Sequence, residues 1–222
     1  MHIYRCEIQL HDMVYFATRE MGRLYETGKY FHNFALTYAL QFVLSDYYIG
    51  EQIPQYQQDL EGLNQQGIYV TPARPLTCDF LIHTFKLAQT WYHVEMGKPK
   101  KNIPGYGRVK ELAPESRFVF FVLSRESAHL PKWLRLGKWM GKASLQSEEL
   151  SDLHERSGDF VVSHPLNPLD LSITPLGYDL ISMPPVSLVN NGRFTGEFYE
   201  GTTSDSRKVI LPKGMRYFAT EA

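Results

Sequence analysis

The sequence predicts an α+β fold that is built around a mostly antiparallel sheet. Ile3–Leu10 alternates apolar and polar residues, as a strand with one buried face does. Phe118–Leu123 is a continuous apolar run, which is typical of a central strand buried on both faces. A helical apolar stripe follows the first strand, and the order strand, helix, strands, long excursion and strand places the chain in the α+β class.

Two helices are expected after the first strand. Thr18–Thr27 reads as a polar loop that contains glycine, and Thr27 is a suitable N-cap for the first helix. The apolar stripe of that helix comprises Phe31, Phe34, Ala35, Tyr38, Ala39 and Phe42. Pro54, in a first-turn position, opens a second and shorter helix, and Gly67 is placed to end it.

Further strands are expected beyond the helices. Ile68–Val70 and Phe80–Phe85 have strand-like composition. Pro72 and Pro75 lack a backbone N–H, so the stretch between them is expected at a sheet edge or in a loop. Further along, Ser147-Glu148-Glu149 predicts the start of a short acidic helix, because acidic side chains suit the N-terminal end of a helix dipole.

The C-terminal part is expected to consist of short strands and loops, and Asn191-Gly192 predicts a hairpin turn. The order of the elements favours a ferredoxin-like or RRM-like core. The chain is therefore expected to be a single RRM-like domain, residues 1–222, with a β-rich C-terminal elaboration at about residues 160–222.

The bulk composition limits the possible functions. The formal net charge of -1 and the pI near 6.7 argue against a histone-like coat for polyanions. Cys6 and Cys78 are the only cysteines and are expected to be reduced, as in a cytoplasmic protein. The N-terminus does not resemble a signal peptide, and no apolar run reaches the ~20 residues of a membrane span. A cytoplasmic protein without membrane contact is expected.

Positive charge is concentrated in two stretches that lack acidic residues. Met96–Lys110 contains Lys98, Lys100, Lys101, Arg108 and Lys110 among glycines and prolines, with Tyr106 close by. Positive charge, close backbone approach at glycine and flat aromatic rings are the features that bind a nucleic-acid backbone and its unstacked bases. A solvated surface loop is the alternative, but unpaired like charges repel one another unless an anionic partner is present.

The second stretch, Lys132–Lys142, contains Lys132, Arg135, Lys138 and Lys142, interleaved with Trp133 and Trp139. Gly137 and Gly141 would allow backbone N–H groups to face phosphates. The glycine spacing and the absence of a metal-binding hydroxyl exclude a phosphate-binding P-loop. The alternative is an amphipathic segment whose tryptophans lie in the core, and the two interpretations are compatible.

A third group is the Arg19/Arg23 loop with its neighbouring aromatic residues. Tyr25 could stack on a splayed base, while the two arginines contact phosphates. A loop that packs against the following helix is an equal alternative.

Catalytic and metal-binding patterns are scarce. The eight histidines are scattered without metal-ligand spacing, so neither a metal nor another cofactor is expected. A metal-independent ribonuclease needs only a few acid–base side chains close together, and His32, His83 or His93 could serve. The acidic group Glu148, Glu149, Asp152 and Glu155 is interpreted as a solvated helix face.

Four runs of the sequence resemble the Cas-five-type subunit of the type I-D CRISPR interference complex (Cascade). These runs are Tyr15–Thr27, Gly67–Ala73, Gly107–Ser116 and Arg135–Ala143. The resemblance covers residues 1–145 and weakens afterwards. It implies an RRM-like core with a long basic β-hairpin, or thumb, at about residues 84–112.

The resemblance also implies a function and partners. Such a subunit grips the 5′ handle of the CRISPR RNA, caps the filament of Cas-seven-type subunits, and contacts the Cas-ten-type large subunit near the protospacer-adjacent motif of target DNA. In this subtype a separate Cas-six-type endonuclease processes the precursor RNA, so the resemblance argues against catalysis.

The sequence therefore predicts a non-catalytic RNA-binding subunit. Tyr25 and Tyr106 are candidates for base stacking. Phosphate contacts are expected from Arg19, Arg23, Lys98, Lys100, Lys101, Arg108, Lys110, Arg135, Lys138 and Lys142. Two alternatives remain open: a metal-independent endoribonuclease that processes precursor CRISPR RNA, and a structural adaptor whose basic loops meet an acidic protein.

Overall fold

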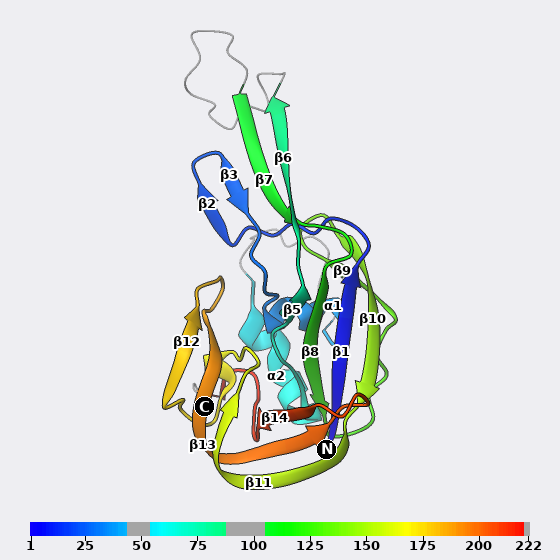
Figure 1. Ribbon diagram of the computed structural model, residues 1–222, viewed down its shortest axis with the longest axis vertical. Helices are drawn as coiled ribbons and strands as arrows, with labels where there is room; N and C mark the ends of the chain where they lie inside the picture. Colours follow the sequence, from blue (N-terminus) through cyan, green and yellow to red (C-terminus); the bar gives the residue numbers. More distant parts are fainter. Residues whose placement is uncertain (44–53, 88–104, 220–222) are drawn as a thin grey trace.

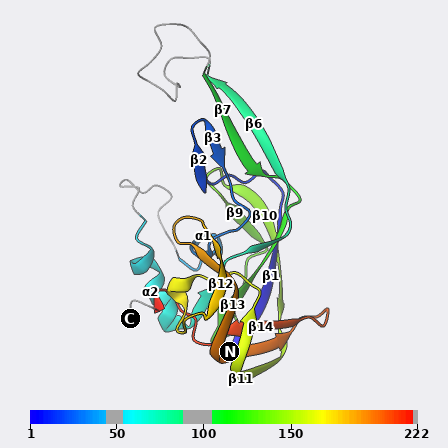
Figure 2. The same cartoon turned by 60° about the vertical axis from the view of Figure 1, so that its left-hand side comes forward.

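The computed structural model describes residues 1–43, 54–87 and 105–219. Over these residues the chain forms three sheets and two α-helices (Figure 1). A central sheet forms the body, a second sheet protrudes from one end of it, and a third curls around the opposite end. Figure 2 shows the same arrangement from another side. The predicted predominance of antiparallel pairing is confirmed.

The central sheet has six strands, in the order β4-β8-β1-β10-β9, and β5 pairs with β8. All of these pairs are antiparallel. The strands are β1 (His2–Leu10), β4 (Ile68–Val70), β5 (Arg74–Thr77), β8 (Arg117–Ser124), β9 (Trp133–Leu136) and β10 (Gly141–Glu149). The first strand therefore agrees with the alternation in the sequence. β5, which follows Pro72 and contains Pro75, takes the edge position that these prolines predict.

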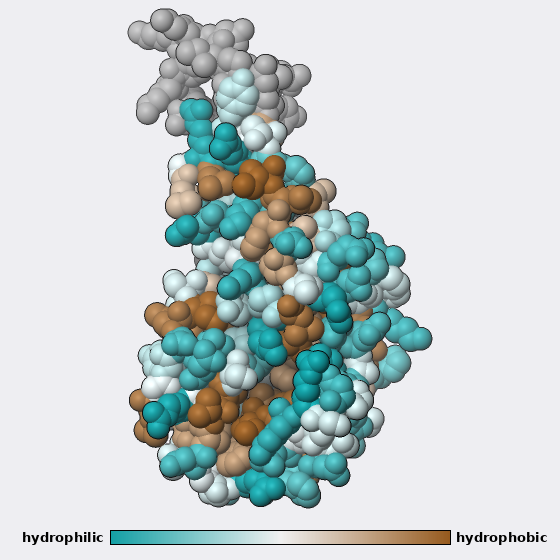
Figure 3. Space-filling model, viewed as in Figure 1, coloured by the Kyte–Doolittle hydropathy of each residue, from teal (hydrophilic) through white to brown (hydrophobic). Residues whose placement is uncertain are grey.

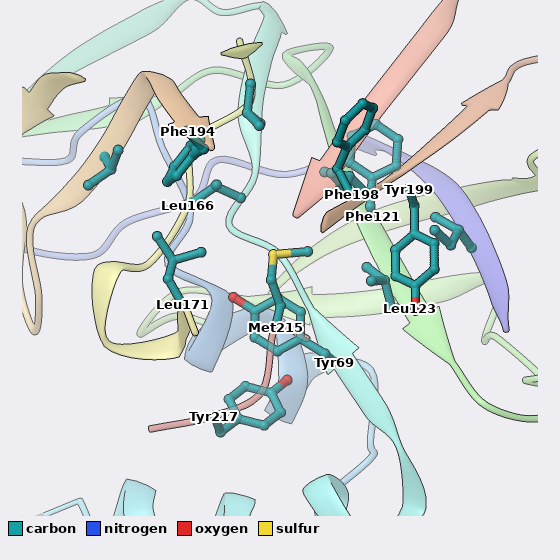
Figure 4. Close-up of a cluster of buried hydrophobic side chains, with 14 of the residues drawn as sticks. Tyr69, Phe121, Leu123, Leu166, Leu171, Phe194, Phe198, Tyr199, Met215 and Tyr217 are labelled. Atoms are coloured by element: carbon teal, nitrogen blue, oxygen red, sulfur yellow. The ribbon is translucent and has the colours of Figure 1, made fainter. Parts of the chain in front are cut away.

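Strand β8 is buried on both faces, as its continuous apolar run predicts. Phe118, Phe120 and Val122 point into one hydrophobic cluster, while Phe121 and Leu123 point into a second one on the opposite face. The first cluster lies between the central sheet and α1. The second joins β8 to α2 and the C-terminal sheet, and Figure 4 shows part of it. A strand between two cores needs apolar residues at every position.

The two helices are α1 (Asn33–Ala39) and α2 (Tyr56–Gln66). Gly67 ends α2 at φ 70°, as predicted. The first helix starts later than expected, because His32 and not Thr27 is its N-cap. Thr27 is buried instead, and its hydroxyl accepts a hydrogen bond from the Phe16 N–H at 3.2 Å.

The protruding sheet contains β2 (Arg19–Met21), β3 (Leu24–Glu26), β6 (Phe80–Leu87) and β7 (Gly105–Leu112). Its order is β2-β3-β7-β6, and β3 pairs with β7 in parallel. The expected loop at 18–27 is thus a short hairpin, which turns at Gly22 with φ 61°. Strands β6 and β7 pair at the place where the thumb is predicted.

The C-terminal sheet contains β11 (Ser151–Val162), β12 (Gly177–Ile181), β13 (Leu188–Thr202) and β14 (Lys208–Pro212). Strand β13 is central, with β11, β12 and β14 paired to it. A short 3-10 helix, η2, spans Pro168–Asp170. Strands β11 and β13 are long, with 12 and 15 residues, while β12 and β14 have five each, so the prediction of short strands and loops was only partly right.

The predicted acidic helix at residue 147 is wrong, because Ser147, Glu148 and Glu149 belong to β10 and pair with β1. Glu148 meets Arg5 across the strands, with their charged atoms 3.3 Å apart. The charges that suit a helix N-terminus therefore find cross-strand partners instead, and tertiary pairing overrides the local preference. Asp152 and Glu155 also lie in a strand, β11.

The predicted hairpin turn at Asn191-Gly192 is also wrong. Both residues lie within β13, where the register with β12 shifts between the pairs Gly177–Arg193 and Asp179–Asn190. Asn191 has φ 50° at this irregularity. Some ladder irregularities and the favoured tight hairpin turns place a residue at positive φ. The dipeptide therefore indicated the conformation of Asn191 but not its place inside a strand.

The RRM-like core stays a prediction. The antiparallel strand order β4-β8-β1-β10 agrees with a ferredoxin-like sheet, and α2 takes the place of the crossover helix between its first two strands, β1 and β4. The second crossover helix of that pattern is missing, because residues 125–132, between β8 and β9, contain no helix.

Two further expectations concern the cysteines and the membrane. Cys6 and Cys78 are both free thiols, so no disulfide links them. Within the described residues, no helix is long and apolar enough to cross a membrane.

A buried polar cluster ties the C-terminal segment to the body. Asp170 is fully buried, and its carboxylate accepts hydrogen bonds from Asn33 Nδ2 at 2.7 Å and from the Tyr69 hydroxyl at 3.1 Å. The Phe218 N–H donates to its other oxygen at 3.0 Å. One carboxylate therefore joins α1, β4, η2 and the end of the chain.

Burial shifts the pKa values of three groups in ways that make stability depend on pH. It lowers the pKa of His32 from 6.5 to about 4 and that of His164 from 6.5 to about 3. It raises the pKa of Asp170 from 3.8 to about 7, against the effect of its hydrogen bonds. Between pH 4 and 6.5, the unfolded chain binds a proton at each histidine, whereas the native chain binds one at the aspartate.

We therefore expect the free energy of unfolding to rise with pH between pH 4 and 6.5. At these three groups the unfolded chain binds two protons and the native chain binds one, so the expected slope is about 1.4 kcal/mol per pH unit. The histidines supply stability that is lost as the pH falls below about 6.5, and the aspartate offsets half of this change. Urea denaturation at several pH values measures the slope, and stability that rises on acidification would contradict these assignments.

Candidate nucleic-acid interface

One face of the protruding sheet carries four of the predicted site residues. Side chains alternate between the faces of a strand, so Tyr106, Arg108 and Lys110 share one face of β7. The register with β3 and β2 places Arg19 on the same face, and Tyr25 on the opposite one. We call Arg19, Tyr106, Arg108 and Lys110 the sheet patch.

The sheet patch carries more positive charges than the neighbouring Glu26 carboxylate can neutralise. Arg19 and Lys110 both approach Glu26, at 2.8 and 3.8 Å. The Lys110 ammonium also lies 4.2 Å from the centre of the Phe80 ring, a cation–π contact. Arg108 is exposed and has no ion pair within the described part of the chain. Two of the three cations share the Glu26 carboxylate and Arg108 adds a third positive charge, which leaves a net positive face.

Arg23 lies between β2 and β3, where its carbonyl accepts a hydrogen bond from the Arg108 N–H at 2.8 Å. This bond ties the turn of the hairpin to β7. Gly107 faces Phe85 across the β6–β7 pair, and a Cβ at this position would lie 2.1 Å from the Phe85 ring. The glycine therefore lets an aromatic ring cover the backbone between Tyr106 and Arg108.

A second cationic surface is the hairpin formed by β9, the following turn and the start of β10. We call residues 133–142 the basic hairpin. Trp133, Arg135 and Lys142 share one face of it, and the Lys142 ammonium lies 4.1 Å from the centre of the Trp133 ring. Arg135 donates to the Met140 carbonyl at 3.1 Å and lies 4.0 Å from Asp12. Trp133 and Trp139 are 50% and 57% exposed, so the alternative of buried tryptophans is wrong.

The two glycines of the basic hairpin serve packing. A Cβ on Gly137, where φ is +74°, would lie 2.5 Å from the Tyr15 carbonyl oxygen, and one on Gly141 would lie 2.8 Å from the Met13 carbonyl oxygen. The Lys138 N–H donates to Tyr15 at 2.8 Å. The expectation that these glycines direct N–H groups toward phosphates is therefore wrong for Lys138, whose N–H is already bonded.

A groove of about 1000 Å³ lies between α1, the basic hairpin and the loop Met183–Pro185. Arg135, Lys138 and Lys142 line it, and no aspartate or glutamate does. Its aromatic lining comprises Phe16, Phe31, Phe34, Tyr38, Tyr56 and Trp133. We call this site the cationic groove. It combines positive charge with flat rings, the combination that a single-stranded nucleic acid requires.

Tyr15 connects the basic hairpin to the protruding sheet. Its ring lies 4.7 Å from that of Trp139, centre to centre. Burial raises the pKa of Tyr15, and the nearby Glu20, Tyr25 and Glu111 raise it further. Tyr25 therefore lies near Tyr15, on the face of the protruding sheet opposite the sheet patch.

The structure thus divides the predicted site residues into two surfaces. Arg19, Tyr106, Arg108 and Lys110 form the sheet patch, while Arg135, Lys138 and Lys142 line the groove. Lys98, Lys100 and Lys101 lie outside the described residues. Contacts of any of these residues with RNA stay predictions.

The three histidines considered for catalysis do not form one cluster. Nδ1 of His83 lies 2.7 Å from Oε2 of the buried Glu111. His32 is buried at the start of α1, where Nδ1 accepts a hydrogen bond from the Phe34 N–H at 3.3 Å. His93 lies outside the described residues. Within those residues, no three His, Cys, Asp or Glu side chains gather to hold a metal ion.

Sequence reasoning missed most of the groove. Phe16, Tyr56 and the prolines at 184 and 185 come from distant parts of the chain, and no motif connects them. The one available signal was the helical stripe at 31–42, which was interpreted as core. Part of that stripe faces the groove.

The surface of the molecule, seen in Figure 3, alternates hydrophilic and hydrophobic residues along the protruding sheet. Together, fold and surface define a β-rich protein with two cationic surfaces of the kind that contact polyanions. The chain belongs to the family of type I-D CRISPR-associated Cas5/Csc1 proteins, whose family model matches residues 1–220. Membership makes it a CRISPR effector subunit and confirms the resemblance seen in the sequence.

The solved structures that are similar to this chain include two CRISPR proteins. One is a chain of the type III-B Cmr-beta complex bound to cognate target RNA and AMPPnP, with a TM-score of 0.47 and 8% identity over 86% of each chain. The other is a CRISPR protein from Archaeoglobus fulgidus, with a TM-score of 0.41 and 11% identity over 96% of this chain and 100% of that one. No curated protein matches the sequence. Both TM-scores are below 0.5.

Proposed function

We propose that this chain is a non-catalytic subunit of the type I-D Cascade that binds the 5′ handle of the CRISPR RNA. In this role it caps the filament of Cas-seven-type subunits and helps the Cas-ten-type large subunit engage target DNA near the protospacer-adjacent motif. The observation that carries the RNA-binding part is the cationic groove, where Arg135, Lys138 and Lys142 surround aromatic walls without a carboxylate. Membership of the family supports the choice of these partners.

The sheet patch extends the proposed path of the RNA. Arg19, Arg108 and Lys110 supply phosphate contacts, and Tyr106, which is 49% exposed, supplies a ring for stacking. Tyr25 lies on the opposite face, so the same nucleotide cannot meet both tyrosines. The strand has to bend around the edge of the protruding sheet, or Tyr25 contacts a different part of the ligand.

The salt dependence of binding tests the number of phosphate contacts. If about five cations meet phosphates of a single strand, we expect the plot of log affinity against log salt to have a slope near −3.5, at ~0.7 per contact. Arg108→Gln should reduce the steepness by about 0.7. Fluorescence anisotropy with single-stranded handle RNA between about 50 and 300 mM salt measures both values.

Arg193→Gln is the matched control, because Arg193 is exposed on the C-terminal sheet, away from both surfaces. It should leave the slope unchanged. A slope close to zero for the unmodified chain would contradict the proposal. A slope that responds equally to Arg193→Gln and Arg108→Gln would contradict the assignment of the sheet patch.

An adaptor that meets an acidic protein is the main alternative to an RNA-binding role. Ultraviolet crosslinking of the assembled complex separates the two, because an RNA-binding chain forms adducts with the guide. Adducts on neighbouring proteins alone would favour the adaptor. The aromatic walls of the groove favour RNA, since stacking uses the flat face of a base.

A metal-independent endoribonuclease is the second candidate, and the pair formed by His83 and Glu111 favours it. The buried carboxylate lies within ion-pair distance of the imidazole, and His83 is half exposed, so its ring can reach a ligand. Incubation of the pure chain with labelled repeat RNA in EDTA tests this activity. A single discrete cut that disappears in His83→Ala would overturn the non-catalytic assignment.

A further inference from the structure

The two faces of the protruding sheet differ in charge. Side chains alternate along each strand, and the register of β2, β3, β7 and β6 assigns each strand position to one face. Arg19, Arg108 and Lys110 lie on the face of the sheet patch. At the strand positions that the structure describes, the opposite face carries neither lysine nor arginine. We call it the acidic face, defined by Glu20, Tyr25, Leu81, His83, Phe85 and Glu111.

The net charge of the acidic face is negative in either state of its histidine. Glu111 is 1% exposed, and its Oε2 lies 2.7 Å from Nδ1 of His83, so a protonated ring would balance this one carboxylate. Glu20 is exposed and forms no ion pair within the described part of the chain. A phosphate of RNA would therefore be repelled from this face.

Aromatic rings lie next to these carboxylates. Burial raises the pKa of Tyr15, and Glu20, Tyr25 and Glu111 raise it further, which places these three groups near the Tyr15 hydroxyl. The Trp139 ring lies 4.7 Å from the Tyr15 ring, centre to centre, and Trp139 is 57% exposed. An exposed tryptophan, a tyrosine and an exposed carboxylate thus meet where the acidic face joins the basic hairpin.

The rings of the acidic face hold no cation within the described chain. On the sheet-patch face, Lys110 lies 4.2 Å from the centre of the Phe80 ring. Among the described residues, no lysine or arginine lies over Tyr25, Phe85 or Trp139. A ring beside a carboxylate attracts a cationic side chain, and arginine can both stack on the ring and bind the carboxylate. The group that complements this face is a cation.

Charge complementarity selects the occupant of the acidic face. RNA would bring phosphates toward Glu20, and a wholly apolar segment would cover that carboxylate without a counter-charge. A protein segment that carries arginine or lysine beside apolar residues compensates Glu20 and also covers Leu81, which is 40% exposed.

We propose that the acidic face is a docking surface for a basic segment of a neighbouring protein subunit, which places an arginine or lysine side chain beside Glu20 and Tyr25. The proposal goes beyond the proposed function, from which it takes only the assembly with other subunits. The protruding sheet then separates its contacts, with RNA on the sheet patch and protein on the acidic face. Tyr25 receives a role that needs no bend in the RNA strand.

Photocrosslinking identifies what meets each face. Tyr25→p-benzoylphenylalanine places the reactive group on the acidic face, and Tyr106→p-benzoylphenylalanine places it on the sheet patch. In the type I-D complex assembled with guide RNA, the first variant should form adducts with another protein subunit, on a peptide that contains arginine or lysine, and the second with RNA. Adducts of the first variant with RNA or with a second copy of this chain, or no adducts at all, would overturn the proposal.

Charge reversal measures the strength of the contact. Glu20→Lys should lower the affinity of the full chain for a complex of the other type I-D subunits about tenfold, because like charges then meet. Glu61→Lys makes the same change on the exposed side of α2 and should have little effect. Glu20→Lys should bind handle RNA at least as well as the unmodified chain, which shows that it is folded. Replacing the crosslinked arginine or lysine of the other subunit with glutamate should restore the affinity of Glu20→Lys.

Failure of the docking surface and failure of the proposed function give different results. Equal effects of Glu20→Lys and Glu61→Lys, with normal RNA binding, would overturn the docking surface and leave the proposed function intact. Absence of RNA binding by the unmodified chain would overturn the proposed function, while a protein adduct at residue 25 would still support the docking surface.

Discussion

Neutralising the three cations of the cationic groove should lower the affinity for single-stranded handle RNA roughly 100-fold at low salt. The change is Arg135→Gln, Lys138→Gln and Lys142→Gln in one chain. No carboxylate lines the groove, and Asp12, 4.0 Å from Arg135, is the acidic partner found beside these three cations in the described residues. A hydrogen bond to a charged group contributes about 1.5–3 kcal/mol, and partial exposure reduces this value. Anisotropy titration measures the change.

A matched triple substitution removes the same charge elsewhere. Arg193→Gln, Arg207→Gln and Arg216→Gln neutralise three exposed arginines of the C-terminal region. If affinity depended on the overall charge alone, both triple variants would lose the same amount. We expect less than about a threefold change for the control, because screening limits the range of exposed charges to about 10 Å. An unchanged affinity of the groove variant would remove the main support for RNA binding there.

Replacing Asp170 with alanine should give the largest loss of stability. The carboxylate is fully buried, and its removal leaves Asn33 Nδ2, the Tyr69 hydroxyl and the Phe218 N–H without an acceptor. We expect the free energy of unfolding to fall by about 3–5 kcal/mol, since several buried donors lose their partner together. Urea denaturation measures the loss.

Asp179→Ala is the control for this substitution. Asp179 is exposed on β12 and accepts one hydrogen bond, from Asn191 at 2.7 Å. Its removal should cost less than about 1 kcal/mol, because solvent replaces the lost contact. Comparable losses in the two variants would show that the Asp170 cluster does not hold the C-terminal segment to the body.

Part of the fold could be predicted because local sequence patterns indicate which residues are buried and where helices end. The apolar run at Phe118–Leu123 predicted a strand between two cores, and Gly67 predicted the end of α2. The prediction failed where pairing outweighs local preference. Ser147-Glu148-Glu149 has the charges of a helix start, but β1 offers it a ladder and Arg5 a counter-charge.

For the candidate site, only the concentration of positive charge could be predicted from the sequence. The excess of lysine and arginine at 132–142 indicated a polyanion-binding surface, and the structure places Arg135, Lys138 and Lys142 on one groove. The wall opposite them comes from α1, and the apolar stripe of that helix carries no sequence signal that separates groove-lining residues from core residues. Strand register decides which side chains of the protruding sheet share a face, because a shift of one position moves a side chain to the opposite face of the sheet.

A density map of the assembled type I-D complex with its guide RNA tests the central claim most directly. We expect a nucleotide of the 5′ handle within the cationic groove, with phosphates at hydrogen-bond distance from Arg135, Lys138 or Lys142. A map in which the guide passes this chain without entering the groove or touching the sheet patch would contradict the account.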